Sequence, residues 1–133
     1  MTTKEVGNIV FNETRSLSGK DIDDARAAIA HAIRNGEEKG GDKRPKTAPP
    51  DIGSIPSAEA GTYRDSQIAA ARADHERAQG TDPSHGATHF NMTVGPSSKP
   101  FYGGHLRSYG PFHNSNPNRQ VPTSDGVYIN FFE

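Results

Sequence analysis

The sequence contains no cysteine, and this absence excludes several kinds of site. Without thiols the chain forms no disulfide framework, no thiolate metal site and no cysteine nucleophile. Long apolar runs are also missing, because no stretch approaches the roughly 20 residues that a membrane-spanning helix requires. The first residues, Met1–Gly7, lack the apolar stretch of a secretory signal. If the protein acts outside the cytoplasm, we expect export by a dedicated secretion or lysis system, or a chain that is a fragment of a larger one.

A surplus of charge of one sign is lacking as well. Lysine and arginine number 15 against 16 aspartate and glutamate, which gives a formal net charge of -1. A nucleic-acid binder or an anionic-membrane binder carries a basic surplus, so neither partner is expected. Hydrophobic residues make up only 31% of the chain, beside 14 glycines and 10 prolines. The 133 residues therefore predict one domain over 1–133, with a modest core and long loops.

Two helices are predicted in the first part of the chain, over 4–13 and 20–34. The helical spacing of apolar residues indicates both: Val6, Ile9 and Val10 in the first, and Ile22, Ala25, Ile29, Ala32 and Ile33 in the second. Ser18 and Asp21 form a capping-box variant before the second helix, and Asn35-Gly36 predicts its end. His31 is expected to be a packed or boundary residue of this helix.

The rest of the chain predicts a loop, a third helix and short strands. Residues 36–57 are rich in glycine, proline and charge, which indicates a long surface loop, with a binding loop or lid as the alternative. A helix is expected from about 64 to 79, after Gly61 separates a short turn. The strand-like pieces are Thr88–Phe90, Phe101–Tyr102 and Gly126–Phe132. Helices followed by short strands predict an α+β domain, mainly helical with a small carboxy-terminal antiparallel β element.

Glu13 is the first candidate for chemistry. It lies in Asn12-Glu13-Thr14-Arg15, directly after the apolar run Ile9–Phe11. A carboxyl group beside apolar packing loses hydration of its charged form, so its pKa rises and it can act as a general acid. The alternative is a solvent-facing glutamate at a helix end, paired with Arg15.

A histidine pair is the second candidate. His85 and His89 are four residues apart, which on a helix would place both rings on one face, as in zinc sites. Pro83 and Gly86 argue against a helix here and favour histidines that form hydrogen bonds on a turn. No metal or other cofactor is expected, and a metal-dependent hydrolase completed by His105 or His113 stays as an alternative. Serine-nucleophile, phosphate-loop and dinucleotide-binding motifs do not occur.

Three segments in chain order resemble a known family. They are Asn12-Glu13-Thr14-Arg15, the alanine-rich Ala25–Asn35 and Gly80–Phe90. Together they resemble the cell wall hydrolase family of spore-cortex-lytic enzymes (SleB-like), which has a Glu-Ala-Arg-Gly motif, a helix ending in asparagine and an Asp-Pro-Thr-Gly-Gly-Ala segment. The resemblance covers about residues 5–91, and Gly126–Phe132 is similar to the last strand of the family.

The sequence also departs from the family pattern. Thr14 and Ser16 stand where the family has alanine and glycine, and the spacing from Glu13 to the next helix is longer. Ser84-His85 stands where threonine and glycine are usual, and residues 92–125 match no part of the family.

The resemblance implies a lysozyme-like fold and an enzyme that cleaves peptidoglycan glycan strands. Glu13 would be the catalytic acid/base, protonating the glycosidic oxygen of the β-1,4 bond between N-acetylmuramic acid and N-acetylglucosamine. A two-carboxylate glycosidase needs a second acid, and no motif ties Asp21, Asp24 or Asp82 to Glu13. A lone glutamate favours a lytic transglycosylase, in which the muramoyl 6-hydroxyl closes onto C1, over a hydrolytic muramidase.

Further roles follow from the same resemblance. Arg15, Tyr63, His89 and Asn91 would bind substrate, with plain structural support as the alternative for each, and Asp82 would brace a turn. An exported antibacterial effector or phage-type lysin would act on the cell wall, in the periplasm or outside the cell, and an effector would need an immunity or inhibitor protein. A non-catalytic interaction module of a cell wall or assembly is the remaining alternative.

Overall fold

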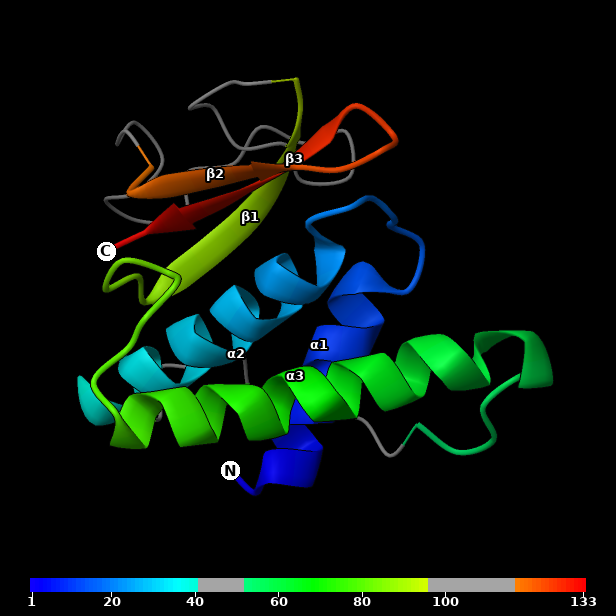
Figure 1. Cartoon of the computed structure of the whole chain (residues 1–133), viewed down its shortest axis with the longest axis horizontal. Helices are drawn as coiled ribbons and strands as arrows, with labels where there is room; N and C mark the ends of the chain where they lie inside the picture. The colour runs from blue at the N-terminus through cyan, green and yellow to red at the C-terminus, as the bar shows by residue number, and fades with distance from the viewer. Residues whose placement is uncertain (41–51, 96–116) are drawn as a thin grey trace.

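The computed structural model describes residues 1–40, 52–95 and 117–133. In this part of the chain, three α-helices precede a three-stranded antiparallel sheet (Figure 1). The elements are α1 Thr3–Thr14, α2 Ile22–Glu38, the 3₁₀ turn η2 Ser57–Glu59, α3 Ala60–Ala78, β1 His89–Val94, β2 Arg119–Pro122 and β3 Val127–Phe132. This order confirms the predicted α+β fold, mainly helical with an antiparallel sheet at the carboxy-terminal end.

The first helix begins with a capping box that the sequence analysis did not identify. The backbone N–H of Glu5 donates to Thr2 Oγ1 (3.1 Å), and the Thr2 N–H donates to Glu5 Oε1 (2.8 Å). Where α1 crosses α3, a Cβ on Gly7 would lie only 2.5 Å from the Gln67 side chain. Glycine therefore lets the two helices approach closely, and Gln67 Nε2 donates to Asn8 Oδ1 across the crossing (3.0 Å).

The start of the second helix differs from its prediction. The capping box expected at Ser18 is wrong, because α2 begins at Ile22 and its N-cap Asp21 makes no side-chain cap hydrogen bond. The Ser18 carbonyl instead accepts a hydrogen bond from the Ser124 backbone N–H (2.8 Å). A contact with the β2–β3 turn, more than 100 residues away along the chain, thus shapes the segment before α2.

The second helix also ends later than the stop predicted at Asn35-Gly36. The Asn35 side chain donates to the Ala87 carbonyl (2.8 Å) and to Asp82 Oδ2 (3.0 Å), so it does not compete for its own backbone. The helix therefore continues to Glu38, and Gly40, at φ 125°, follows its end.

The third helix is longer than predicted, because Gly61 lies inside its first turn and does not interrupt it. Packing of this part of the helix on α1 overrides the low helix propensity of glycine. Of the predicted surface loop 36–57, the first residues belong to α2 and Ser57 begins η2. Residues 41–51, where a binding loop or lid was the alternative, lie outside the described residues.

The sheet has the order β1-β3-β2, with β3 antiparallel to both neighbours. In β1 and β3, Phe90 lies opposite Phe131 and Met92 opposite Ile129. Because strand side chains alternate, these residues share the face that packs against the helices. The strands predicted at Thr88–Phe90 and Gly126–Phe132 correspond to β1 and β3. The strand β2 was not predicted, and Phe101–Tyr102 lies outside the described residues.

The hydrophobic core surrounds α2, which packs against the sheet on one side and against α1 and α3 on the other (Figure 1). It is modest, as expected, because α2 contributes mostly alanine. Its buried apolar members are Val6 and Val10 of α1; Ala25, Ala28, Ile29, Ala30, Ala32 and Ile33 of α2; Ala70 and Ala73 of α3; and Ala87, Val121, Ile129 and Phe131. No helix in the described residues combines the length and hydrophobicity that crossing a membrane requires.

A seam of charged side chains joins α2, α3 and β2. The Asp24 carboxylate accepts hydrogen bonds from Arg72 Nη2 (2.6 Å) and Arg119 Nη2 (3.1 Å). Arg72 also donates to Glu76 Oε2 (3.2 Å). The hydrogen bond from Arg72, helped by Arg119 and opposed by partial burial, holds the pKa of Asp24 below its usual value. The Asp24 carboxylate of α2 therefore connects α2 to both α3 and strand β2.

Candidate functional site

Glu13 lies in the last turn of α1, between exposed Asn12 and buried Thr14. Glu13 is itself exposed, so burial does not supply the desolvation that the sequence pattern suggested. Its neighbour Thr14 fixes the helix end: Thr14 Oγ1 donates to the Val10 carbonyl (2.7 Å) and accepts from Arg26 Nε (3.1 Å). Arg26 is only 4% exposed on α2. The turn that carries Glu13 is thus held by a hydrogen bond to a buried side chain of α2.

Arg15, directly after α1, binds the residue that precedes α3. Its Nε and Nη2 donate to the two carboxylate oxygens of Glu59, at 2.9 and 2.7 Å. The guanidinium carbon lies 4.5 Å from the centre of the Phe11 ring. The hydrogen bond from Arg15 holds the pKa of the Glu59 carboxyl below its usual value. Arg15 therefore clamps the end of α1 to the start of α3, and a sugar at Arg15 would compete with Glu59.

Tyr63 packs on α1, on a different side from Glu13. Its hydroxyl donates to Asn8 Oδ1 (2.9 Å), and its ring meets the Phe11 ring edge-on at 5.3 Å. Glu13 is two residues from both Phe11 and Arg15, which corresponds to about 200° around a helix. The structure therefore brings Arg15 and Tyr63 together through Phe11 and places Glu13 on the opposite side of α1.

Asp82 braces the turn between α3 and β1. Its carboxylate accepts hydrogen bonds from Ser84 N (2.8 Å), Ser84 Oγ (2.6 Å) and Gly86 N (3.0 Å), and from Asn35 Nδ2 of α2 (3.0 Å). Partial burial opposes ionisation, but these hydrogen bonds outweigh it and hold the pKa of Asp82 below its usual value. Asp82 thus occupies the bracing position that the sequence indicated.

Replacing Asp82 with asparagine is expected to lower the free energy of unfolding at pH 7 by about 1–3 kcal/mol, because an amide cannot replace a charged acceptor of four hydrogen bonds. A lowered pKa stabilises the fold above the unfolded pKa of about 3.9, and this stabilisation is lost as the pH falls through the folded value. Urea unfolding from pH 7 to pH 2 should therefore show the gap between Asp82→Asn and wild type narrowing below about pH 4. A gap that stays constant over this range would contradict the assignment.

His89 and Asn91 begin β1 and differ in exposure. His89 is exposed, and its Nδ1 lies 2.9 Å from Thr88 Oγ1. Asn91 is only 4% exposed, and its Oδ1 accepts a hydrogen bond from Asn130 Nδ2 (3.0 Å). Gln120 Nε2 in turn donates to Asn130 Oδ1 (2.8 Å), so Asn91 belongs to a buried amide cluster of the sheet. Of the two residues, only His89 is accessible to a ligand.

The histidine pair does not share a helical face. His85 lies in the turn after α3 with a φ of 58°, whereas His89 is on a strand, which agrees with the sequence argument against a helix here. Asn118 Nδ2 donates to the His85 carbonyl (3.1 Å), which ties this turn to the residue before β2. His105 and His113 lie outside the described residues. Within the part of the chain that the structure describes, no group of three or more histidine, aspartate or glutamate side chains is placed to hold a metal ion.

One buried polar cluster was missed by the sequence analysis. His31 is fully buried on α2, as expected of a packed residue. Its Nε2 lies 3.0 Å from Glu76 Oε1 of α3, and its Nδ1 lies 3.7 Å from Asp82 Oδ1. The flanking alanines were the only local signal, because the partner on α3 is 45 residues away along the chain.

Comparisons with known proteins give no match: no protein-family model, no curated protein and no solved structure is similar to this chain. The protein can therefore be classified by its structure alone: it is a mainly helical α+β domain with an exposed glutamate, Glu13, in the last turn of its first helix.

Proposed function

We propose that the protein cleaves peptidoglycan glycan strands as a lytic transglycosylase, with Glu13 as the general acid/base. The observation that carries the proposal is the position of Glu13 at the end of α1. A general acid must be accessible to the glycosidic oxygen and held within hydrogen-bonding reach of it. Glu13 is exposed, while the neighbouring Thr14–Arg26 and Arg15–Glu59 contacts fix the helix end that carries it.

The proposed reaction uses Glu13 first as an acid and then as a base. In the proposed reaction the Glu13 proton moves to the glycosidic oxygen as the bond from that oxygen to C1 of N-acetylmuramic acid breaks. The resulting carboxylate takes the proton of the muramoyl 6-hydroxyl, whose oxygen bonds to C1. The products are a 1,6-anhydromuramic acid end and a free N-acetylglucosamine hydroxyl.

The engagement of two of the three aspartates considered from the sequence favours transglycosylation over hydrolysis. Hydrolysis requires a second carboxylate that activates water or attacks C1. Of the three aspartates considered from the sequence, Asp24 is bound by Arg72 and Arg119, and Asp82 braces its turn through Ser84 and Gly86. A carboxylate with a lowered pKa and several hydrogen-bond donors is a poor base. Of the three aspartates, Asp21 is therefore the remaining candidate for a second catalytic carboxylate.

The surrounding residues take different parts in this proposal. Arg15 acts as a positioning residue that holds the end of α1, and exposed His89 is the candidate for hydrogen bonds to sugar hydroxyls. Tyr63 supports α1, and Asn91 supports the sheet. The substrate places the site of action at the cell wall, and an immunity protein, if the protein is an antibacterial effector, would act by covering Glu13.

Digestion of purified cell wall sacculi with the full chain tests the function directly. Mass spectrometry of the released muropeptides is expected to show 1,6-anhydro ends. Reducing muramic acid ends would replace the transglycosylase with a hydrolytic muramidase, and the absence of soluble muropeptides would overturn the proposal. A parallel digest with a chelator distinguishes the proposed reaction from the metal-dependent alternative. The proposed reaction should continue at the same rate, whereas a metal-dependent hydrolase should lose activity.

A further inference from the structure

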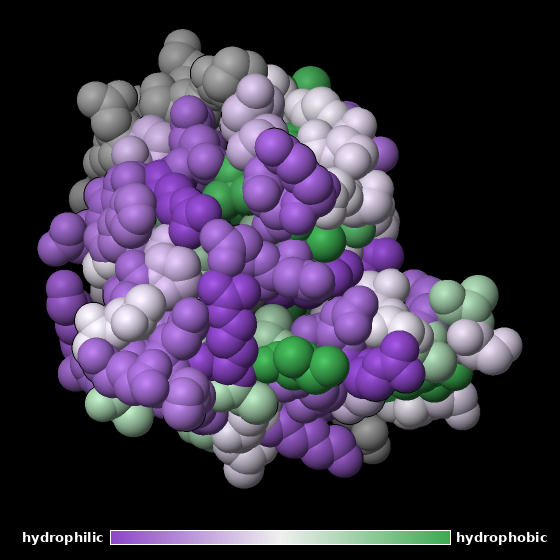
Figure 2. Space-filling model, in the orientation of Figure 1, coloured by the Kyte–Doolittle hydropathy of each residue, from purple (hydrophilic) through white to green (hydrophobic). Residues whose placement is uncertain are grey.

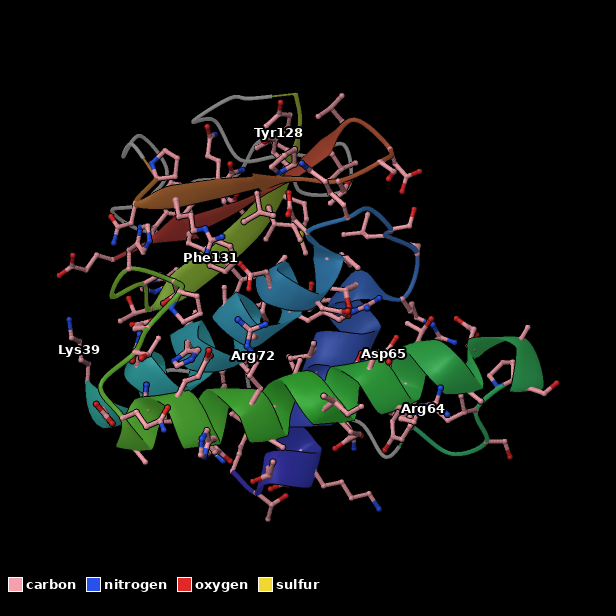
Figure 3. The ribbon with its side chains drawn as sticks, viewed as in Figure 1. Lys39, Arg64, Asp65, Arg72, Tyr128 and Phe131 are labelled. Atoms are coloured by element: carbon pink, nitrogen blue, oxygen red, sulfur yellow. The ribbon has the colours of Figure 1, made fainter. Side chains whose placement is uncertain are left out.

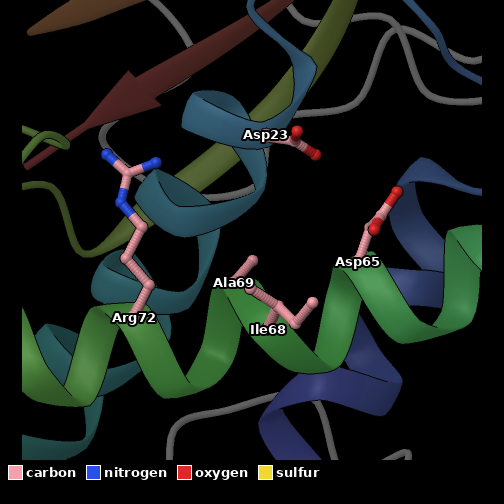
Figure 4. Close-up of a pocket in the computed structure, with 5 residues that line it drawn as sticks. All are labelled: Asp23, Asp65, Ile68, Ala69 and Arg72. Atoms are coloured by element: carbon pink, nitrogen blue, oxygen red, sulfur yellow. The ribbon is translucent and has the colours of Figure 1, made fainter.

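A half-open hollow of about 230 Å³ lies between the first turn of α2 and the middle of α3 (Figure 4). It is lined by Asp23, Asp65, Ile68, Ala69 and Arg72. Ile68 is 57% exposed and presents apolar surface to solvent beside the hollow. On the face seen in Figure 2, small apolar areas are surrounded by hydrophilic side chains. The hollow thus combines an apolar floor with a polar rim.

Two carboxylates at the rim of the hollow, Asp23 and Asp65, have oxygen atoms that accept no hydrogen bond from the described residues. Asp65 makes no hydrogen bond or ion pair with any residue that the structure describes. Asp23 is 74% exposed and uses only Oδ1, which lies 3.2 Å from Arg26 Nη1. In Figure 4, Asp23 projects from the first turn of α2, and Asp65 projects from α3 on the same side of the hollow.

Arg72, the remaining charged residue of the hollow, does not neutralise this pair. Its guanidinium donates to Asp24 (2.6 Å) and to Glu76 (3.2 Å). Both of these carboxylates lie outside the hollow lining. The positive charge of Arg72 is therefore satisfied within the charged seam, and Arg26 offsets Asp23. Asp65 is the carboxylate of the mouth that has no cationic partner among the described residues.

We propose that this hollow is a docking site for one lysine or arginine side chain of a partner protein. The two carboxylates fit a cationic end group, and Ile68 and Ala69 fit the alkyl stem that carries it. A bare metal ion would gain nothing from the apolar floor, and an anion would be repelled by the rim.

The proposed docking is a separate activity from the proposed glycan cleavage, because Asp65 and Ile68 belong to α3 and take no part in the contacts that hold the Glu13 turn. Asp65 and Ile68 variants are therefore expected to release the same muropeptides as the wild type.

A nuclear magnetic resonance titration of the full chain with an acetylated and amidated tetralysine peptide tests the proposal. We expect concentration-dependent shifts of the Ile68 and Ala69 methyl signals that weaken in high salt. Asp65→Asn should lower the apparent affinity about threefold, the size of one exposed ion pair. Asp125→Asn, which removes the same charge from the exposed β2–β3 turn, is the matched control and should titrate like the wild type.

Three results would overturn the docking site. The Ile68 and Ala69 methyl signals could stay unchanged with tetralysine, or Asp65→Asn could titrate like Asp125→Asn. Calcium chloride alone could also reproduce the shifts, which would make the hollow a simple cation site. Ile68→Ser keeps the test independent of charge, because removal of the apolar floor should weaken binding while both carboxylates remain.

Discussion

Glu13→Gln is expected to reduce the rate of glycan cleavage by about 10²–10⁴-fold, the usual contribution of a general acid/base. Glutamine keeps the shape of the side chain but has no carboxyl proton to donate to the glycosidic oxygen. Because Glu13 is exposed and the helix end is held by its neighbours, the variant should remain folded, and its melting temperature is measured beside that of the wild type. Soluble muropeptides released per minute from sacculi, quantified by chromatography, are the readout.

Glu133→Gln is the matched control for this experiment. Glu133 is exposed beyond β3 and is 3.8 Å from Lys39 in a solvent-facing pair, so the same chemical change should leave the cleavage rate unchanged. If Glu13→Gln and Glu133→Gln release muropeptides equally fast, Glu13 is not the acid. Loss of activity in a Glu13→Gln protein that melts at a lower temperature would indicate a structural effect instead.

Phe131→Ala is expected to cost about 3–5 kcal/mol of unfolding free energy, because it leaves a cavity in the core. Phe131 is fully buried on the central strand, opposite Phe90, and points toward α2 (Figure 3). Small domains have a total stability of about 5–15 kcal/mol, so much of the variant should be unfolded at 37 °C. Urea unfolding followed by circular dichroism measures the difference.

Two companion variants keep this prediction falsifiable. Phe131→Leu retains most of the apolar volume and should be folded, so its unfolding free energy can be measured even if Phe131→Ala does not fold. Tyr128→Ala removes an aromatic ring from the other side of the same strand, where the side chain is half-buried (Figure 3). Equal losses for Tyr128→Ala and Phe131→Ala would show that the helix-facing side of the sheet is not the main core.

The sequence was informative where structure depends on local periodicity. The spacing of Ile29 and Ile33 with the alanines of α2 predicted a helix that the structure confirms, and the apolar run Gly126–Phe132 predicted β3. Ser18 shows the limit of this reasoning, because its carbonyl is engaged by Ser124 and the helix begins later than its capping pattern indicates. The short polar strand Arg119–Pro122 has little strand signal of its own and is defined by pairing with β3.

The candidate site was predictable only in part for the same reason. The position of Glu13 at the end of the first helix follows from the pattern of α1. Whether Tyr63 lies on the same side of α1 as Glu13 depends on how α3 crosses α1. The sequence does not specify that crossing. The buried partner of Asn91 comes from a distant segment, so its burial in a polar cluster could not be distinguished from exposure to a ligand. The burial of His31 was expected from its flanking alanines, but its partner Glu76 on α3 was not.

The order of strands has a consequence for how the protein is made. β1 and β2 do not pair with each other, since both need β3 between them. The three helices can form as they leave the ribosome, but the sheet must wait until Val127–Phe132 has been synthesised. Until then two strand edges and the apolar surface of α2 stay uncovered, which is the state in which a nascent chain associates with chaperones or other chains.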